Sequence, residues 1–380
     1  MKRLVLAGAG HAHLHVLRAL AETPWSGVEV VLVTPHPRQI YSGMVPGWIA
    51  GHYHLDECVA PILPLAQAAG VRTVQGAVCG LDADRRSVSL QDGRTIAFDV
   101  LSLDTGAGIA MDAGVARHPG LLPVRPLESF VAQWTQALPM LLSDVHARVA
   151  VVGGGAAGVE LALALAYRLG RESGPAAPRV TLACGGGPLR GHARGVVRRA
   201  RAALAQQGVE LIEQRVSFGA SGLETAAGEP LAAAWVIAAT GVAPPDWLAA
   251  SGLALAPDGL IAVGQGQQSV SHANVFAAGD VASRIDAPHA KSGVYAVRAG
   301  PVLSRNLQRA LAGHPPAPYQ PQRRSLYLLA TGPREAIVSW GPFAASGRFA
   351  WRWKDWIDRR FMRQYQSAPA ARCRGDAPSG

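Results

Sequence analysis

The chain has 380 residues, of which 49% are hydrophobic and 16% are charged, and its formal net charge is +10 at pH 7. This length provides for two or three domains with sizeable cores, and the composition excludes a disordered chain. The positive charge comes from 33 arginines and 3 lysines, with no dense basic run interleaved with aromatic residues before the C-terminal region, which disfavours a nucleic-acid-binding protein.

The cysteines and the apolar segments narrow the cellular context. Cys58, Cys79, Cys184 and Cys373 are scattered without CxxC or CxxxxC spacing, which argues against a disulfide framework, a zinc site and a redox-active dithiol. A reducing cytoplasm is the simplest compartment. Because the N-terminal apolar run breaks at glycines, and no 18-residue apolar span is free of charge and proline, we expect neither a signal sequence nor a membrane-crossing segment.

A first glycine-rich turn lies close to the N-terminus. The apolar run Leu4 to Ala7 leads into GAGHAH, residues 8–13, and then into a helical pattern. This order predicts the strand, turn and helix of a dinucleotide-binding fold, in which backbone N–H groups meet a pyrophosphate. The match is weak by itself, because His13 replaces the third glycine and the next strand, residues 28–33, is not followed by the usual ribose-binding acid.

Three histidines alternate in this turn, at His11, His13 and His15. Alternate positions do not share one face of a helix, so we expect no three-histidine metal site. Packing or phosphate contact is the simpler interpretation.

A second glycine-rich turn is complete. Gly153, Gly155 and Gly158 follow a strand of β-branched residues and precede an alanine- and leucine-rich helix, which makes this dinucleotide signal strong. Glu160 is expected in the first helical turn, where a carboxylate suits the helix dipole. The following strand, residues 179–183, ends at Cys184 without an acid. Several arginines come next, and contact with a 2′-phosphate and simple exposure to solvent are both open for them.

The segment 274–299, NVFAAGDVASRIDAPHAKSGVYAVRA, is a candidate ligand-binding segment. An apolar strand ends there at Gly279 and Asp280, and we expect a helix start, a loop and then a second helix over 294–299. A glycine before an acid lets the backbone approach a ligand while the carboxylate binds hydroxyl groups. Two further strands, DVLSLDTGA and VIAATG, end in Thr-Gly turns. Residues 35–57 are expected to form an ordered loop and short helix against a ligand, with a surface connection as the alternative.

The C-terminal region combines two predicted strands, residues 325–330 and 335–340, with a basic aromatic helix over 351–365. Trp353, Trp356, Ile357 and Phe361 are expected on one arc of this helix together with Phe349. An amphipathic helix of this kind either lies in a membrane interface or caps the core of the protein, and the pattern leaves both alternatives open.

Taken together, this order of signals resembles the flavoproteins of the pyridine nucleotide-disulfide oxidoreductase superfamily, in the branch of type II NADH dehydrogenases and sulfide:quinone reductases. More narrowly, the strings GHAHLHVLR, YSGMVPGWIAGHY, PHAKSGVYAVRAGPVLSRNL and WRWKDWIDRRFM resemble the flavoprotein module found next to, or fused with, selenide, water dikinase. Sulfide:quinone reductases use cysteines near the flavin, including one in a strand close to the C-terminus. The corresponding LYLLATG carries none, which disfavours sulfide oxidation.

The resemblance implies an α/β fold with two Rossmann-like dinucleotide-binding domains and a small C-terminal α+β segment. Residues 1–115 and 260–318 are expected to form a discontinuous FAD-binding domain, 116–259 an inserted NAD(P)H-binding domain, 319–365 a membrane-proximal segment and 366–380 a disordered tail. Asp280 is expected to bind the ribityl chain. The predicted cofactor-binding residues are Gly8, Gly10, His11, His13, Ser42, Gly43, Thr105, Gly106, Gly153, Gly155, Gly158, Glu160, Thr240, Gly241, Gly279, Asp280 and Ser292.

We therefore expect an FAD-dependent enzyme that takes hydride from NAD(P)H and passes electrons to a quinone-like or other small acceptor without a redox-active disulfide. Lys291, beside a helix start near Ser292, is expected to stabilise the negative charge of reduced flavin, with an ordinary surface lysine as the alternative. Competing hypotheses are FAD-dependent oxidation of a sulfur or selenium compound and a non-catalytic flavin-binding or membrane-docking protein. We expect a cytoplasmic location, a candidate peripheral membrane contact through 349–365 and a functional link to selenide, water dikinase.

Overall fold

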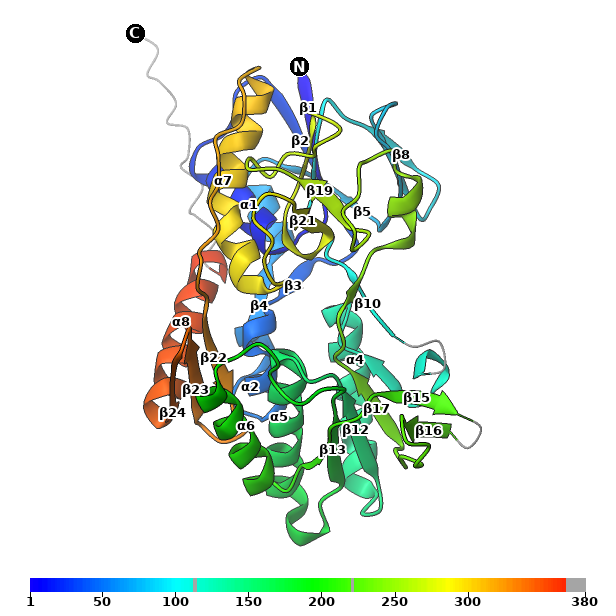
Figure 1. Ribbon diagram of the computed structural model, residues 1–380. Helices are drawn as coiled ribbons and strands as arrows, with labels where there is room; N and C mark the ends of the chain where they lie inside the picture. Colours follow the sequence, from blue (N-terminus) through cyan, green and yellow to red (C-terminus); the bar gives the residue numbers. More distant parts are fainter. Residues whose placement is uncertain (112–114, 220–221, 367–380) are drawn as a thin grey trace.

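The computed structural model describes residues 1–111, 115–219 and 222–366. Two parallel sheets, each covered by helices, lie one above the other, and a C-terminal sheet and helix run along one side of both (Figure 1). The predicted α/β fold with two Rossmann-like units is confirmed. The predicted tail falls outside the described residues except for Gln366, which ends the last helix.

The first unit is a five-stranded parallel sheet built from both ends of its sequence. Its strand order is β20 (Val275–Ala277), β9 (Val100–Leu103), β1 (Lys2–Ala7), β2 (Val28–Thr34) and β5 (Arg72–Gln75). Alternate residues of β1 face opposite sides: Leu4 and Leu6 pack under α1 (His11–Glu22) and α7 (Gly293–Leu311), whereas Val5 packs under the second layer. That second layer consists of β6 (Val78–Asp82), β7 (Ser87–Leu90), β8 (Thr95–Ala97), β19 (Ile261–Val263) and β21 (Ala282–Arg284).

The second unit repeats this plan with contiguous sequence. Its strand order is β11 (Leu121–Pro123), β17 (Trp235–Ala238), β12 (Arg148–Val152), β13 (Arg179–Ala183) and β14 (Glu210–Ile212), all parallel. It carries α4 (Leu127–Ser143), α5 (Ala156–Ser173), α6 (Arg194–Gln206) and the hairpin of β15 (Val216–Gly219) and β16 (Gly222–Thr225). Two antiparallel connections, β10 (Gly108–Ile109) and β18 (Val242–Ala243), join the units (Figure 1). The predicted domain boundaries remain a prediction.

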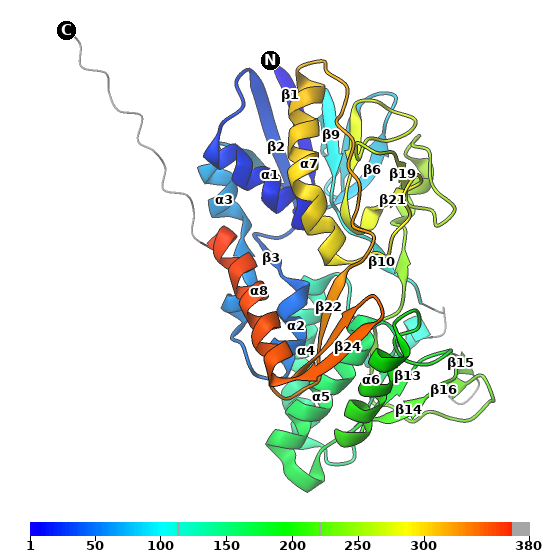
Figure 2. The same cartoon turned by 60° about the vertical axis from the view of Figure 1, so that its left-hand side comes forward.

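The C-terminal segment is a three-stranded antiparallel sheet, β22 (Leu326–Ala330), β23 (Ala336–Trp340) and β24 (Phe343–Gly347), followed by α8 (Arg348–Gln366). It lies against the region between the units that holds α2 (Val45–Ile49), as Figure 2 shows. Residues 35–61 also supply β3 (Arg38–Ile40), β4 (Val59–Pro61) and the short helical turns Ser42–Met44 and Leu55–Cys58, and α3 (Ile62–Ala68) follows. No helix in the described ranges has both the length and the apolarity needed to cross a bilayer.

The structure differs from two sequence-based expectations for local structure. After Asp280 there is one 3₁₀ turn, Gly279–Val281, and then β21, because the chain pairs with β19 instead of starting a helix. The helix predicted over 294–299 continues through Pro301 to Leu311, because residues on both sides of the proline are buried against the first sheet. Within the predicted apolar arc of α8, Phe349, Trp353 and Trp356 are exposed, whereas Phe361 is buried.

Candidate functional site

The first glycine turn is closed by an acid that the sequence analysis missed. Gly8 has φ +87°, and a side chain there would meet the backbone of Asp104 and Thr105. Asp104 follows β9, and its buried Oδ2 accepts hydrogen bonds from the N–H groups of Ala12 (2.8 Å) and His13 (3.0 Å). Burial raises the pKa of Asp104 to about 6, although these N–H groups oppose the rise. The N-terminus of α1 is therefore partly satisfied by a carboxyl group of the protein itself.

The three histidines of this turn have separate surroundings. The buried His13 ring places Nδ1 2.6 Å from Gly8 O and Nε2 2.8 Å from Ser102 Oγ, and burial lowers its pKa to about 4. Its side chain thus ties the turn to β9, and its backbone N–H already donates to Asp104 Oδ2. The ring of His11 lies against Tyr41, and His15 lies against Gly300.

Gly279 and Asp280 lie beside the first glycine turn. Gly279 has φ +69°, and a side chain there would run into the Asp104 carboxylate. Asp280 Oδ2 is 2.8 Å from the Nη2 atom of Arg125, which follows β11 of the second unit. The ion pair therefore joins the carboxyl edges of both sheets, and no sequence pattern predicts this contact.

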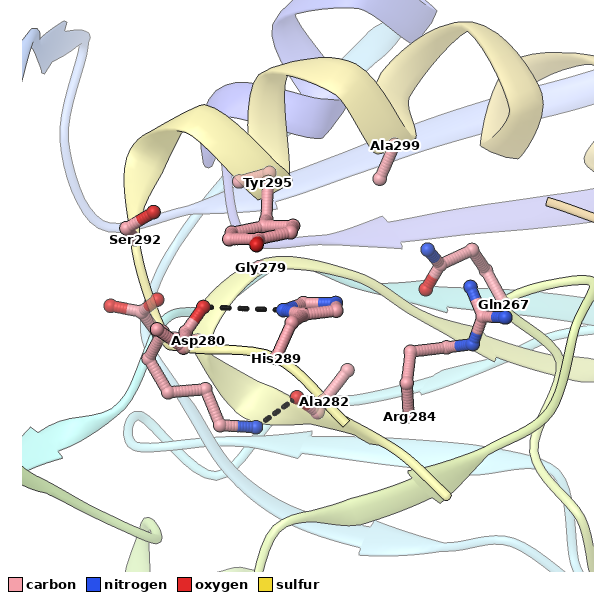
Figure 3. A pocket seen from close by; sticks show the side chains of 12 residues that line it. Gln267, Gly279, Asp280, Ala282, Arg284, His289, Ser292, Tyr295 and Ala299 are labelled. Carbon is pink, nitrogen blue, oxygen red and sulfur yellow. Dashed lines mark hydrogen bonds between the residues drawn. The ribbon is translucent and has the colours of Figure 1, made fainter. Parts of the chain in front are cut away.

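The N-terminus of α7 lies beside Asp280. Ser292 is its N-cap residue, and the buried Ser292 Oγ has no partner within the described residues. Ser42 lies close by, since a methyl group on Gly293 would be 3.4 Å from Ser42 Oγ. A cavity of about 10 Å³ between α7 and β21 is bordered by Asp280, Ser292 and the stacked rings of His289 and Tyr295 (Figure 3).

The ammonium group of Lys291 points to β21. Its Nζ donates to Ala282 O (2.5 Å) and Ser283 Oγ (2.6 Å) and lies 3.6 Å from Asp258; Figure 3 marks the bond to Ala282. Burial lowers the pKa of Lys291, and Asp258 opposes that shift. Direct stabilisation of a reduced flavin by Lys291 stays a prediction, and it requires the ammonium to leave these partners.

Among the described residues, no carboxylate caps the N-terminus of the helix that follows the second glycine turn. Gly153 has φ +129°, and Gly158 lies so close to Gly153 O that no side chain fits. Gly155, the N-cap residue of α5, has open space around it. Across residues 1–111, 115–219 and 222–366, no side chain accepts a hydrogen bond from the first N–H groups of α5. This terminus is free to meet an anion.

The two Thr-Gly turns have different roles in the structure. Thr240 Oγ1 donates to Ala110 O, and the Ala110 N–H donates to Gly241 O at 2.8 Å, so this turn fixes the connection between the units. Thr105 is exposed at the carboxyl edge of the first sheet, and Gly106 beside it has φ +74°. Of these two turns, only Thr105–Gly106 is open toward the flavin site predicted in the first unit.

The comparison with known proteins decides the family. Residues 2–300 match the pyridine nucleotide-disulphide oxidoreductase family. The chain belongs to this family. Among its relatives is the NADH dehydrogenase-like protein MT1860 of Mycobacterium tuberculosis (strain CDC 1551 / Oshkosh), 30% identical over 308 residues that cover 76% of this chain and 75% of the relative. Demethylphylloquinone reductase NdbB of Synechocystis sp. (strain ATCC 27184 / PCC 6803 / Kazusa) is 29% identical over 182 residues, which span 45% of this chain and 44% of that protein.

Solved structures share the fold. The sulfide:quinone oxidoreductase of the hyperthermophilic bacterium Aquifex aeolicus has a TM-score of 0.78, covering 97% of this chain and 93% of that one at 18% identity. NDH2 from Plasmodium falciparum in complex with NADH has a TM-score of 0.76, covering 97% and 99% at 12% identity. Family membership makes this chain an oxidoreductase of the flavoprotein type, with NADH dehydrogenase-like relatives.

The pyridine nucleotide-disulphide oxidoreductase family implies a flavin, and the first unit fits one. Ser292 Oγ and His11 Nε2 are buried polar atoms without a partner in the described residues, and both border the Asp104 and Asp280 region. Gly8 and Gly279 leave the backbone without side chains at the same edge. The Asp104 carboxylate opposes a pyrophosphate at α1, so the fit is closest at Asp280 and α7.

Glu160 lies elsewhere than predicted. α5 begins at Ala156, so Glu160 is beyond its first turn, and its Oε1 accepts the Ala330 N–H of β22 at 2.8 Å. The expected role at the helix dipole is therefore wrong. Burial raises the pKa of Glu160 to about 7, although Lys354 opposes the rise.

A buried polar cluster surrounds Glu160. Lys354 Nζ of α8 donates to Asp358 Oδ2 (2.7 Å) and to Gly43 O (2.6 Å), and Tyr41 Oη donates to Asp358 Oδ1 (3.1 Å). Burial lowers the pKa of Lys354, but Asp358 and Glu160 raise it more. We call Glu160, Lys354, Asp358 and Tyr41 the buried cluster. Gly43 and Ser42 connect it to the N-terminus of α7.

Two signals for these missed residues were present in the sequence. Asp104 directly follows a mostly apolar strand, VLSL, a pattern similar to the one that drew attention to Asp280. Lys354 is one of three lysines, and Asp358 lies one helical turn beyond it. The pairing of Arg125 with Asp280 had no such signal, because it depends on how the two units pack.

Proposed function

We propose that this flavoprotein takes a hydride from NAD(P)H, with FAD as its flavin, and delivers two electrons to a quinone-like acceptor. The second glycine turn supports nucleotide binding, because α5 presents free N–H groups to a pyrophosphate. Asp280, Ser292 and the α7 N-terminus support a flavin at the first unit. When bound, the flavin supplies the hydride-accepting centre.

The buried cluster is the observation that carries the choice of acceptor. A quinone that receives the two electrons of one hydride also takes up two protons, one of which must come from solvent. Glu160, with its pKa raised to about 7, holds a proton close to neutral pH, and Lys354 lies beside it. Lys354 donates to Gly43 O, which lies between the buried cluster and the N-terminus of α7 at the predicted flavin site.

No pair of cysteines competes with this reading in the described residues. Cys58 and Cys184 are buried in different units, and Cys79 is exposed on β6. Burial raises the pKa of Cys58 to about 12, so its thiol stays protonated. Oxidation of a sulfur or selenium compound is the alternative that the experiments below address. The link to selenide, water dikinase rests on the sequence strings alone.

Anaerobic reduction of the flavin tests which compound donates the electrons. The purified protein, loaded with FAD, is mixed with NADH, NADPH or sulfide while flavin absorbance is followed. The proposal expects bleaching by a nicotinamide coenzyme and slow or no bleaching by sulfide. Rapid bleaching by sulfide alone would overturn it in favour of the alternative.

Glu160→Gln tests the acceptor side. Reoxidation by a water-soluble quinone needs protons, whereas reoxidation by ferricyanide needs none. We expect the variant to slow the quinone reaction by about tenfold, in the range typical for a proton-transfer group, and to leave the ferricyanide reaction unchanged. Equal rates for variant and wild type with the quinone would remove the buried cluster from the proposal.

The exposed side of α8 suggests where a lipid-soluble acceptor is met. Phe349, Trp353 and Trp356 are 57%, 42% and 52% exposed. They share one stripe with Arg352 and Arg360 at helical spacing, and Arg360 lies over the Trp356 ring at 5.2 Å. The opposite side of α8, with Trp351 and Lys354, packs on the core. The core-facing side of α8 thus matches the capping alternative, and the exposed side supports the membrane-interface alternative.

The β23–β24 turn adds Trp340 and Phe343, 54% and 55% exposed. Aromatic side chains with arginines among them suit the interface of an anionic membrane, so we propose peripheral attachment through this surface. Phe349→Ser/Trp353→Ser/Trp356→Ser is expected to abolish co-flotation with phosphatidylglycerol-containing vesicles. Met140→Ser, at an equally exposed position on α4, serves as the matched control and is expected to float like wild type.

A further inference from the structure

The end of β13 in the second unit lacks the group that would hold an unphosphorylated ribose. A carboxylate there normally binds the 2′-hydroxyl of the adenosine ribose, whereas an arginine accommodates a 2′-phosphate. Here the strand ends at Cys184, which is buried, and burial raises the pKa of its thiol. A protonated thiol cannot replace a carboxylate as an acceptor for ribose hydroxyls.

The loop after Cys184 is anchored to the glycine turn. The Leu189 N–H donates to Gly154 O at 2.6 Å, and the buried Leu189 side chain holds a left-handed backbone, φ +54°. Arg190 follows directly. Its guanidinium folds back over the loop, since a methyl group on Gly186 would lie 3.7 Å from Arg190 Nη1.

A second arginine comes from the other side of the loop. A methyl group on Gly185 would lie 3.4 Å from the Cβ atom of Arg215. Both arginines are exposed, and within residues 1–111, 115–219 and 222–366 neither has an ion-pair partner. The carboxylate beside this loop, Glu213, is already paired with Arg201. The balance of charge around the end of β13 is therefore positive.

We infer that the second unit selects NADPH over NADH, with Arg190 and Arg215 as the residues that bind the 2′-phosphate. This inference rests on the proposed function and names its coenzyme. A phosphate dianion between two guanidinium groups forms charge-assisted hydrogen bonds that the 2′-hydroxyl of NADH cannot form. Because both arginines are exposed, the preference weakens as ionic strength rises.

Binding of adenosine fragments tests the inference without any redox reaction. Calorimetric titration of the FAD-loaded protein is expected to show 2′,5′-ADP binding at least about tenfold more tightly than 5′-ADP. Arg190→Ala/Arg215→Ala is expected to remove that difference, while Arg85→Ala, an exposed arginine on the first unit, retains it. Equal affinity of the wild-type protein for the two fragments would overturn the inference.

Coenzyme kinetics provide the second readout. The double variant is expected to lose at least about tenfold in kcat/KM for NADPH and less than twofold for NADH. Gly185→Asp, which places a carboxylate at an exposed position beside Arg215, is expected to shift the preference toward NADH. Wild-type preference for NADH would overturn the inference and leave the proposed function standing. Selective 2′,5′-ADP binding without flavin reduction by either coenzyme would overturn the proposed function and leave the inference about the 2′-phosphate site standing.

Discussion

The two glycine turns begin with the same strand, turn and helix but differ at the helix N-terminus. At α1, the Asp104 carboxylate accepts the N–H groups of Ala12 and His13. At α5, no side chain in the described residues occupies the corresponding place. A helix N-terminus carries a partial positive charge, and in the first unit part of that charge is already balanced by the protein.

This difference teaches that a glycine motif specifies backbone shape rather than affinity for an anion. We therefore expect the first unit to bind its dinucleotide mainly through Asp280 and the α7 N-terminus, where Ser292 Oγ has no partner among the described residues. The second unit can rely on the α5 terminus and on the arginines after β13. The second turn is also the one whose glycine spacing is complete.

Gly158→Ala is expected to have the largest effect. Its methyl group would overlap Gly153 O, a backbone atom that cannot move aside without separating α5 from β12. We expect a loss of stability of about 3 kcal/mol or more, measured as a fall in the thermal midpoint of the FAD-loaded protein. Gly155→Ala is the control: its backbone is extended (φ −72°) and its surroundings are open, so the midpoint should hardly change.

Gly10→Ala tests the first turn in the same way, with a different obstacle. Here the methyl group would meet the Asp104 carboxylate, a side chain rather than backbone. We expect the variant to lose about 2 kcal/mol of stability and to bind FAD weakly. Adding Asp104→Ala to this variant should restore much of the stability and much of the FAD affinity. The thermal midpoint measures the stability, and flavin fluorescence measures the affinity. A double variant no better than Gly10→Ala would show that the carboxylate is not what the methyl group meets.

Asp104→Asn removes the charge but keeps the shape. The pKa of Asp104 is raised in the folded protein from 3.8 to about 6, so its stabilising contribution is complete below about pH 3.8 and is lost as pH rises through about 6. His11, whose pKa burial lowers, and Asp280 face the same group. The variant should therefore gain stability relative to wild type by roughly 1.4 kcal/mol between pH 5 and pH 7.5.

Asp104→Asn also tests the difference between the two glycine turns through its effect on FAD binding. Above pH 6 the wild-type carboxylate repels a pyrophosphate, so FAD affinity should fall as pH rises in wild type and stay level in Asp104→Asn. Fluorescence titration at pH 5.5 and pH 7.5 measures both. A parallel fall in the two proteins would mean that the pyrophosphate lies away from α1.

The fold was largely predictable from the sequence, because each unit begins with an apolar strand followed by a glycine turn. Gly153, Gly155 and Gly158 lie where the spacing placed them, at the junction of β12 and α5. The continuous α7 was not predictable, since Pro301 ordinarily ends a helix. Only burial of the surrounding residues against the first sheet overrides that preference.

The candidate site was less predictable than the fold. For His13 the sequence leaves packing and phosphate contact open, and in the structure the ring binds Gly8 O and Ser102 Oγ. Glu160 was assigned to a helix dipole, but it faces β22 and Lys354, residues about 170 positions or more away in sequence. These partners come from elements whose packing periodicity alone cannot specify, and the Arg125–Asp280 pair is of the same kind.

Lys291→Ala is expected to have the smallest effect, and it extends the comparison to a third helix N-terminus. α7, like α5, begins without a side-chain cap, and Lys291 stands just before its N-cap residue. If the ammonium stabilised reduced flavin directly, its removal would slow flavin reduction and lower the flavin potential. Because Nζ is held by Ala282 O, Ser283 Oγ and Asp258, we expect less than about a threefold change in rate, within what about 0.7 kcal/mol produces. Stopped-flow reduction by NADPH and a dye-coupled potential measurement decide this. A tenfold slower reduction with unchanged thermal stability would show that Lys291 leaves β21 when the flavin is bound, and the α7 terminus would then need a full positive charge beside its dipole.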